Sequence, residues 1–280
     1  MSYYNWKIGT VNIRTGKDDE KLGRVVNEID KAELAICGLQ ELRRLNTGSA
    51  LIQTSNNDTT TKYEVHWSGL TNKRHHGVGI VIKVDPAIEI VEITPVNSRI
   101  IAADIIVRGC SLKIINCYAP TEDSAEPTKS SFYRTLNKQI DSVSKKQKLI
   151  CIGDFNASSS AAWTNSSLRE GKVIENLIVN SNGERFHELF NANKLSVLNT
   201  WFTHKRCRRV TWHSPDGSTK KVYDFILSCS WLRQFVTNCR VYNSYDFDSD
   251  HRLVIAHLTT PSTKKARFVD RKKSTRKLGV

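Results

Sequence analysis

The sequence predicts an α/β fold, a four-layer sandwich in which two stacked, mostly antiparallel β-sheets are flanked by helices. Apolar runs of strand length outnumber the helical patterns. The helical patterns recur once per group of strands, and two sheets stacked face to face with helices outside fit that order. At 280 residues the chain has a length that a large two-sheet domain reaches as one unit. We therefore expect one domain over residues 1–259.

The first half of the chain contains strand-like runs and one helical pattern. Leu22, Val25, Val26 and Ile29 recur at helical spacing and predict a helix packed on a sheet. The Thr-, Asn- and Ser-rich stretch 46–62 is predicted to be a loop. The predicted strands are residues 6–11, 34–39, 63–67, 77–82, 88–93, 100–107 and 112–118.

The second half repeats this arrangement with two helices. Phe132, Leu136 and Ile140 mark one of them. Ser181, with Glu184 three residues later, predicts a capping box at the start of the other. The predicted strands are residues 149–152, 197–198, 209–212, 223–227, 236–242 and 253–258.

Basic residues are in clear excess. The chain has 42 Lys and Arg against 28 Asp and Glu, a net charge of +14. Residues 260–280 hold eight basic residues against Asp270 alone, and we expect this stretch to be a flexible basic tail or linker. The rest of the excess lies on the folded part, where a positive field attracts a polyanion such as DNA, RNA or an anionic membrane. Charge alone does not choose among these partners.

The cysteines and the apolar runs exclude several classes of protein. None of the seven cysteines belongs to a CxxC pair or a zinc-type spacing. Cys37, Cys117 and Cys151 stand in apolar runs, where cysteine behaves as a small buried hydrophobe. No apolar run approaches the roughly 20 residues that span a bilayer, and no signal peptide is apparent. We expect an intracellular protein with reduced thiols and no membrane association.

Polar side chains follow several of the predicted strands at the point where the strand ends. They are Asn12, Gln40-Glu41, Tyr118-Ala119-Pro120, Asp154-Phe155-Asn156 and, before the last strand, Asp248-Ser249-Asp250-His251. Asp224 lies within a strand that is predicted to be buried, where a carboxylate needs a partner such as an imidazole, a metal ion or hydrogen-bond donors.

Each of these residues also has an ordinary explanation. Asn12, Asp154 and Asn156 are common turn formers, Glu41 can form a surface ion pair with the arginines that follow it, and Asp250 and His251 can be a local pair. Together, however, they place acids and amides at the ends of strands throughout one domain. Such oxygen ligands are those that Mg²⁺ prefers.

The same motifs carry a resemblance to a known family. In order and approximate spacing they resemble the exonuclease–endonuclease–phosphatase superfamily over roughly residues 5–259. Within it the chain is most similar to the apurinic-type endonuclease domain of LINE-type non-LTR retrotransposons, including copies of the craniofacial development protein type. The supporting motifs are Asn12-Ile13-Arg14-Thr15, Cys37-Gly38-Leu39-Gln40-Glu41, His76-Gly77-Val78-Gly79, Tyr118-Ala119-Pro120-Thr121-Glu122-Asp123, Gly153-Asp154-Phe155-Asn156, Asn182-Gly183-Glu184-Arg185, Thr211-Trp212-His213-Ser214-Pro215-Asp216-Gly217 and Ser249-Asp250-His251.

One position departs from the pattern of the abasic-site repair enzymes, which have Asn-x-Asp at the first motif. Here Asn12 is followed by Ile13 and Arg14. The change removes one carboxylate from the expected metal site, which lowers the expectation of a dedicated repair enzyme and leaves the nicking chemistry intact.

The resemblance implies a role for each motif residue. Glu41 would hold Mg²⁺, with Mn²⁺ as a possible substitute, and Asn12 and Asp250 would lie near the ion. The other implied catalytic residues are Asp154, which would orient or deprotonate the attacking water, Asn156 and Tyr118, which would bind the scissile phosphate, and His251, which Asp224 would orient so that it stabilises the developing charge. Which group is the general base stays open.

The expected DNA contacts come from a basic segment and its neighbours. Thr211 would lie beside the DNA backbone, and Arg14 is a further contact. Lys205, Arg206, Arg208 and Arg209 are interpreted as a basic hairpin that reaches into a groove, with a solvated turn as the alternative. Residues 73–76 are a weaker candidate.

These expectations combine into a Mg²⁺-dependent endonuclease that nicks double-stranded DNA and leaves a 3′-hydroxyl, as in target-site nicking during retrotransposition. We expect a monomer that acts in the nucleus on chromosomal DNA and can be part of a longer polyprotein with a reverse transcriptase. Two alternatives stay open. One is a phosphatase or phosphodiesterase of the same fold that acts on a small phosphorylated substrate, and the other is a non-catalytic DNA-binding module.

Overall fold

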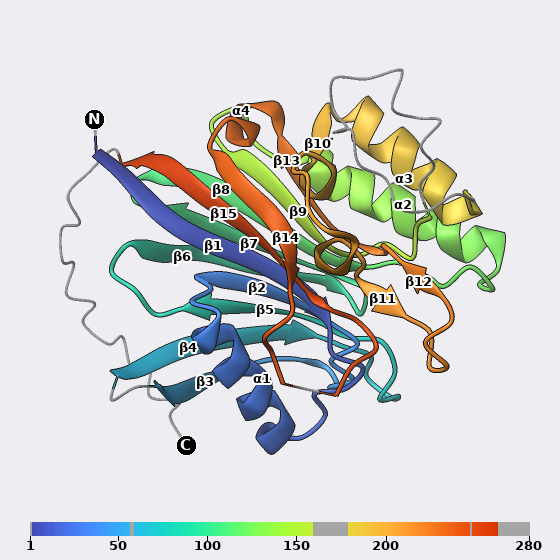
Figure 1. The fold of residues 1–280 in the computed structure, drawn as a ribbon, viewed down its shortest axis with the longest axis horizontal. Helices are drawn as coiled ribbons and strands as arrows, with labels where there is room; N and C mark the ends of the chain where they lie inside the picture. Colours follow the sequence, from blue (N-terminus) through green and yellow to red (C-terminus); the bar gives the residue numbers. More distant parts are fainter. Residues whose placement is uncertain (1, 57–58, 159–178, 247, 263–280) are drawn as a thin grey trace, which may run out of the picture.

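Two β-sheets form the centre of the molecule (Figure 1). The computed structural model describes residues 2–56, 59–158, 179–246 and 248–262. Within them the first sheet contains, in spatial order, β14 (Val236–Tyr242), β15 (Leu253–Ser262), β1 (Ser2–Asn12), β2 (Ile36–Gln40), β5 (Val78–Lys83), β4 (Thr59–Ser68) and β3 (Thr47–Asn56). The second contains β10 (Leu195–Val197), β13 (Asp224–Cys229), β9 (Lys148–Asp154), β8 (Cys110–Tyr118), β7 (Ile100–Val107) and β6 (Ile88–Asn97).

Each sheet contains one parallel pair, β1 with β2 and β8 with β9, and its other pairs are antiparallel. Parallel neighbours cannot be joined by a hairpin and need a crossover connection. The helices α1 (Asp19–Lys31) and α2 (Glu126–Asp141) provide these two crossovers. The predicted mostly antiparallel pairing is therefore confirmed.

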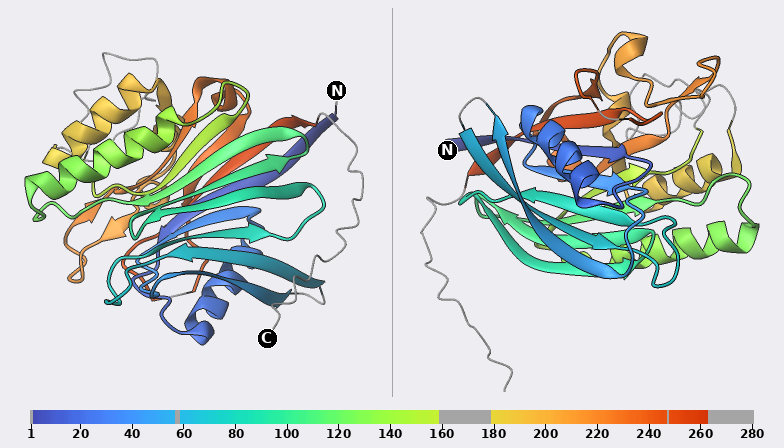
Figure 2. Two further views of the ribbon diagram at one scale, coloured as in Figure 1. Left: turned by 180° about the vertical axis from the view of Figure 1, so that it is seen from behind. Right: turned by 90° about the horizontal axis from the view of Figure 1, so that it is seen from below.

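The apolar side chains form three layers of core between four layers of secondary structure. The middle core lies between the sheets and includes Ile8, Ile114 and Ile152. One outer core joins α1 to the first sheet, and the other joins α2 and α3 (Ser181–Ala192) to the second. Figures 1 and 2 show α1 on one side of the paired sheets and α2 with α3 on the other. The predicted four-layer α/β sandwich is confirmed.

Three local predictions were wrong. Within the stretch 46–62, residues 47–56 form strand β3 and residues 59–62 begin β4, which was predicted only from residue 63. Threonine favours strands, and β3 is an edge strand with much exposed surface, so it lacks the apolar run that revealed the other strands. The strand predicted at 209–212 lies after the 3₁₀ turn η3 (Arg206–Arg208), and only its last residue is in a strand. That strand is β11 (Trp212–His213), which pairs with β12 (Lys220–Lys221). Asn180, not Ser181, caps α3, because its side chain accepts a hydrogen bond from the Gly183 amide.

Strand β15 extends to Ser262, three residues beyond the predicted domain boundary. The predicted tail from residue 263 onward lies outside the described residues. None of the helices in the described part of the chain combines the length and apolar composition needed to cross a bilayer.

Candidate active site

Three polar side chains form a row at one end of the gap between the sheets. Because side chains alternate along a strand, Tyr118 shares the inner face of β8 with Ile114, Asp154 shares that of β9 with Ile152, and Asp224 shares that of β13 with Ile226. The strand register places Tyr118 beside Asp154 and Asp154 beside Asp224. Adjacent strands thus present a phenol and two carboxylates side by side.

Gly153 allows this row to form. Its φ of +151° lies in a region that L side chains rarely adopt, and a Cβ atom there would lie 2.0 Å from the carbonyl oxygen of Cys117. The glycine therefore permits the close approach of β8 and β9 immediately before Asp154.

The opposite sheet contributes Asn12, the last residue of β1, and Glu41, the residue after β2. Glu41 has a φ of +54°, in the left-handed region. Strain of this kind in a non-glycine residue costs energy and occurs preferentially at functional sites.

A buried polar network ties the two sheets together behind these residues. Asn116 on β8 donates from Nδ2 to the carbonyl oxygens of Leu39 and Gly79, at 2.9 and 2.8 Å. Gln40 donates from Nε2 to Asn116 Oδ1 at 2.6 Å and to Thr10 Oγ1 at 2.9 Å. Among the side chains of Asn116, Gln40 and Thr10, Gln40 Oε1 is the one polar atom that has no hydrogen-bond partner. The paired groups favour a single arrangement, and they fix the end of β2 next to Glu41.

Hydrogen bonds link the contributions of the two sheets directly. Asn12 donates from Nδ2 to Glu41 Oε1 at 3.0 Å and to Asp154 Oδ2 at 3.1 Å. Tyr118 donates its hydroxyl to the same Glu41 oxygen at 2.9 Å. The backbone N–H of Asn156 donates to Asp154 Oδ1 at 2.9 Å. The structure therefore brings these five predicted residues into one cluster.

His251 completes the cluster from the loop before β15. Its Nδ1 lies 2.9 Å from Asp224 Oδ2, and its Nε2 lies 3.8 Å from Asp154 Oδ2. The Ser249 hydroxyl accepts from the His251 amide and donates to the carbonyl of Asn12. These bonds hold the loop against the end of β1, and a buried carboxylate fixes the imidazole so that its other nitrogen faces Asp154.

The surroundings shift the ionisation of these groups. Burial raises the pKa of Asp154 to about 7, with nearby Asp224 adding to the effect and His251 opposing it. Burial alone would lower the pKa of His251, but Asp224 and Asp154 outweigh it and raise the value to about 9. Burial likewise acts to raise the pKa of Glu41, and the hydrogen bonds from Asn12, Arg43 and Tyr118 hold it below its ordinary value.

The donor atoms at the site fit a divalent metal ion. In the described part of the chain, the potential ligand atoms of Asp154, Asp224 and His251 lie within 4.8 Å of one another, but the protonated imidazole has no lone pair for a metal ion. Asp224 Oδ1 and Asp250 Oδ1 are buried oxygens without a hydrogen-bond partner, which a cation would satisfy. Carboxylate oxygens also suit a hard ion such as Mg²⁺.

Of the predicted metal-binding residues, Glu41 lies at the site as expected, but the side chain of Asn12 does not present its oxygen to an ion. Glu41 is partly exposed at the cluster, with Oε2 held by Arg43 Nη2 at 2.5 Å. Asn12 instead turns its amide nitrogen to the carboxylates, and its Oδ1 accepts from the Arg14 amide at 3.0 Å. In this arrangement Asn12 is a hydrogen-bond bridge between carboxylates rather than a ligand.

Asp250 lies between two side chains at the edge of the cluster. Trp212 donates from Nε1 to Asp250 Oδ2 at 3.0 Å, and Arg14 Nε lies 3.7 Å from Oδ1. The half-exposed Arg14 is thus positioned next to the carboxylate, where it can contact an anion.

Thr211 does not have its predicted place beside the DNA. It is fully buried, and its hydroxyl accepts hydrogen bonds from the amides of Tyr223 and Asp224 at 2.9 and 3.2 Å. A direct contact with DNA is therefore excluded in this structure. Thr211 instead accepts from the backbone amides at the start of β13, and these bonds hold Asp224 in place.

The basic segment before Thr211 is also different from the predicted hairpin. Lys205, Arg206 and Arg208 are exposed on the 3₁₀ turn η3, and Arg209 is half-buried. The hairpin nearby is β11–β12, which projects beyond the ends of the sheets (Figure 1). The solvated turn left open from the sequence is what the structure shows, and its exposed charges lie within a few residues of Thr211 in the chain.

Sequence reasoning missed three residues of the site. Arg99 donates from Nη1 to the carbonyls of Tyr118 and Ala119, both at 3.2 Å, and its Nη2 lies 3.1 Å from His76 Nε2. Burial lowers the pKa of His76 to about 4, so the ring is neutral near pH 7 and can accept from Arg99. Trp212, described above, is the third. His76 was predicted only as part of the weaker DNA-contact candidate 73–76, Trp212 belonged to a quoted motif without a role, and Arg99 had no signal beyond its turn.

Comparison with known proteins gives a family and a fold. The family model described as "Endonuclease-reverse transcriptase" matches residues 112–255, just over half of the chain. Craniofacial development protein 2 of Bos taurus is 28% identical over 250 residues, which cover 89% of this chain and 40% of that protein. The chain thus spans well under half the length of this curated relative.

Two solved structures share the fold. One is the endonuclease domain of TRAS1, a telomere-specific non-LTR retrotransposon, with a TM-score of 0.61, 14% identity and coverage of 90% of this chain and 98% of that one. The other is the 3′-5′ exonuclease NExo from Neisseria meningitidis, with a TM-score of 0.62, 21% identity and coverage of 90% and 99%. The predicted superfamily fold is confirmed. The predicted similarity to craniofacial development proteins is confirmed. The predicted LINE-type kinship is supported only at the level of fold, by the TRAS1 endonuclease domain.

Proposed function

The chain belongs to the endonuclease–reverse transcriptase family, and from this membership and the geometry of the site we propose that it is a metal-dependent endonuclease that nicks double-stranded DNA and leaves a 3′-hydroxyl end. The observation that carries the proposal is the Asp224–His251 pair, whose free imidazole nitrogen faces Asp154 in a cluster that Asn12 links to Glu41.

The residues have complementary roles in phosphodiester hydrolysis. Asp154, with its raised pKa, accepts a proton from the attacking water, while the Asn156 amide and Asn12 hold its two oxygens in place. His251 stays cationic because of Asp224 and stabilises the charge that builds on the phosphoryl oxygens. Tyr118 and the Asn156 side chain are within the cluster to hydrogen-bond the phosphate.

Glu41 and Asp250 would hold the ion, Mg²⁺ with Mn²⁺ as a substitute. Bound there, it would neutralise charge on the phosphate and favour ionisation of a bound water. Asn12 orients Glu41 through its hydrogen bond.

A plasmid assay tests the proposal. The purified chain is expected to convert supercoiled plasmid to open circle with Mg²⁺, and the nick should be extendable by a DNA polymerase because it ends in a 3′-hydroxyl. Glu41→Ala and His251→Ala are expected to abolish nicking, while Glu64→Ala, a half-exposed glutamate on β4, should retain it. Nicking that persists in chelator or in either site variant would refute the mechanism.

The alternatives are separated in the same experiment. Release of phosphate from a small phosphate ester without nicking would favour the phosphatase reading, and DNA binding without cleavage would favour a non-catalytic module. We further propose double-stranded DNA in the nucleus as the substrate, a monomer as the active form, and a reverse transcriptase as a partner within a longer polyprotein.

A further inference from the structure

A groove beside the catalytic cluster has the chemistry of a phosphate-backbone site. It has a volume of about 440 Å³ and lies between the β6–β7 turn and helix α2. The turn contributes Asn97, Ser98 and Arg99, and the helix contributes the hydroxyl side chains of Thr128, Ser131 and Thr135. No carboxylate is among the residues that line it.

Arg99 connects this groove to the catalytic cluster. Its Nη1 binds the carbonyls at the end of β8, and its guanidinium lies 5.1 Å from the centre of the Tyr118 ring. Tyr118 in turn donates to Glu41. Only Tyr118 therefore separates the groove from Glu41, the predicted metal ligand. The positively charged Arg99 lines the groove and contacts Tyr118.

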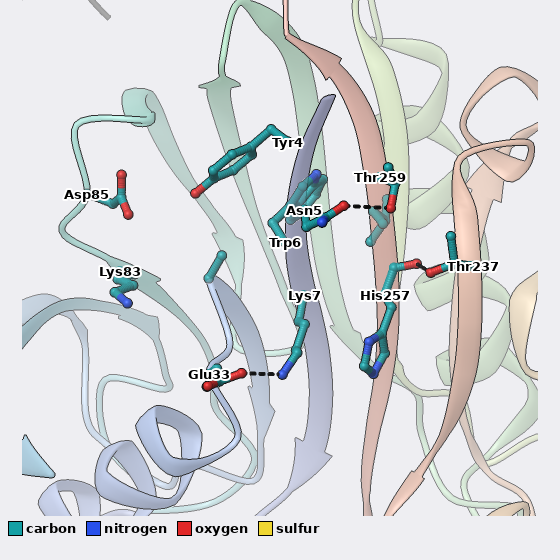
Figure 3. A pocket seen from close by; sticks show the side chains of 12 residues that line it. Tyr4, Asn5, Trp6, Lys7, Glu33, Lys83, Asp85, Thr237, His257 and Thr259 are labelled. Atoms are coloured by element: carbon teal, nitrogen blue, oxygen red, sulfur yellow. Dashed lines mark hydrogen bonds and ion pairs between the residues drawn. The ribbon is translucent and has the colours of Figure 1, made fainter. Parts of the chain in front are cut away.

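A second pocket provides a contrast. It has about 460 Å³ and is lined by Tyr4 and Lys7 of β1 and His257 of β15 (Figure 3). Asn12, at the end of β1, is not among its lining residues. It contains the carboxylates of Glu33 and Asp85, and Glu33 already pairs with Lys7 at 2.7 Å. A polyanion would meet negative charge there, whereas the groove next to Arg99 has none in its lining.

We propose that the groove between the β6–β7 turn and α2 binds the sugar–phosphate backbone of DNA next to the bond that is cut. Hydroxyl and amide side chains with an arginine are the groups that commonly contact DNA phosphates. Because the backbone of DNA is continuous, a strand whose phosphate lies at the catalytic cluster must leave it along the adjoining surface, and the groove begins at that point. The inference rests on the proposed function, since it names a further contact of the same substrate.

Two neighbouring serines of α2 allow a matched test. Ser130 and Ser131 are both exposed, and only Ser131 lines the groove. The probe is a fluorescently labelled 20-base-pair duplex, and its affinity is measured by anisotropy in EDTA at 50 and 300 mM NaCl. Ser131→Asp is expected to weaken binding about fivefold at the lower salt, because a new negative charge opposes a nearby phosphate, and the difference should shrink at 300 mM. Ser130→Asp should stay within about twofold, because it meets only the general field of the DNA.

A substitution that adds a positive charge separates an electrostatic effect from a folding defect, because a folding defect would not tighten binding. Ser131→Lys is expected to tighten binding, and Ser130→Lys to leave it nearly unchanged. Equal effects at the two positions, no effect at either, or no binding of the duplex by the unaltered chain would overturn the proposal. Because the assay needs no hydrolysis, a chain that fails to nick plasmid but shows the difference between residues 130 and 131 would refute the proposed function and support the groove. Nicking with equal effects at both positions would do the opposite.

Discussion

Replacement of Asp224 by asparagine removes one charge from the centre of the site with little change in shape. The carboxylate is fully buried, its Oδ2 lies 2.9 Å from His251 Nδ1, and its backbone amide is held by Thr211. Asparagine can fill the same space and keep an oxygen near Nδ1, so the variant tests the charge rather than the packing.

The expected magnitude follows from the pKa values. Asp224 helps to raise the pKa of His251 to about 9, so about 97% of the imidazole is protonated at pH 7.5. Without that charge, the pKa of His251 falls toward its ordinary value of 6.5, at which about 9% is protonated at pH 7.5, while Asp154 still opposes the effect of burial. If the cation is the active form, kcat at pH 7.5 falls by up to about tenfold. Asp224 also raises the pKa of Asp154, so that value falls below about 7 in the variant.

Both limbs of the pH profile should therefore move to lower pH. In the unaltered protein, activity is expected to rise as Asp154 loses its proton near pH 7 and to fall as His251 loses its proton near pH 9. The assay is the initial rate of plasmid nicking from pH 5 to pH 10 at fixed Mg²⁺. Asp104→Asn, a change to a half-buried carboxylate that pairs with Lys113 on the same sheet, should leave the profile in place. If the rate of Asp224→Asn rises and falls at the same pH values as that of the unaltered protein, and only its maximum is lower, the electrostatic role of Asp224 is refuted.

Three further predictions concern the frame of the site and its charged edge. Asn116→Ala should lower the free energy of unfolding in urea by about 3 kcal/mol, since it leaves buried partners unpaired, while Asn72→Ala, at an exposed position before β5, should cost under about 0.5 kcal/mol; similar losses would contradict the network. Gly153→Ala should destabilise by at least about 3 kcal/mol because its Cβ would overlap the Cys117 carbonyl, whereas Gly23→Ala, in open space within α1, should stabilise by up to about 1 kcal/mol, and thermal melts compare the two. Arg208→Ala on η3 should reduce the salt dependence of duplex affinity by about one unit of slope, and an unchanged slope would remove η3 from the DNA contacts.

Much of the fold could be predicted because the strands carry strong apolar signals. Strands β1, β7, β8 and β15 are buried on both faces and appear as nearly continuous apolar runs. Strand β3 and the first part of β4, before residue 63, could not be found in this way. Their burial comes from α1 and from each other, and their sequence is largely polar and threonine-rich.

The candidate site was predictable as a set of residues but not as an arrangement. Strand ends revealed Asn12, Glu41, Asp154 and His251, because polar groups after apolar runs are visible in a sequence. The buried place of Thr211 was not visible, since its hydroxyl is used by amides 12 and 13 residues later in the chain. Arg99 had no local signal, because its partners come from two other segments.

The sequence by itself determined which residues are buried strands, which polar groups interrupt them, and that Asp224 needs a partner. The resemblance implied His251 as that partner, and only the tertiary structure decided which hydrogen bonds link it and the other polar groups. The strand register aligns Tyr118, Asp154 and Asp224, and the stacking of the sheets lets Asn12 reach both carboxylates. The physical reason is that periodicity within a strand is a local property, whereas register and sheet packing depend on contacts between segments that lie 30 to 240 residues apart.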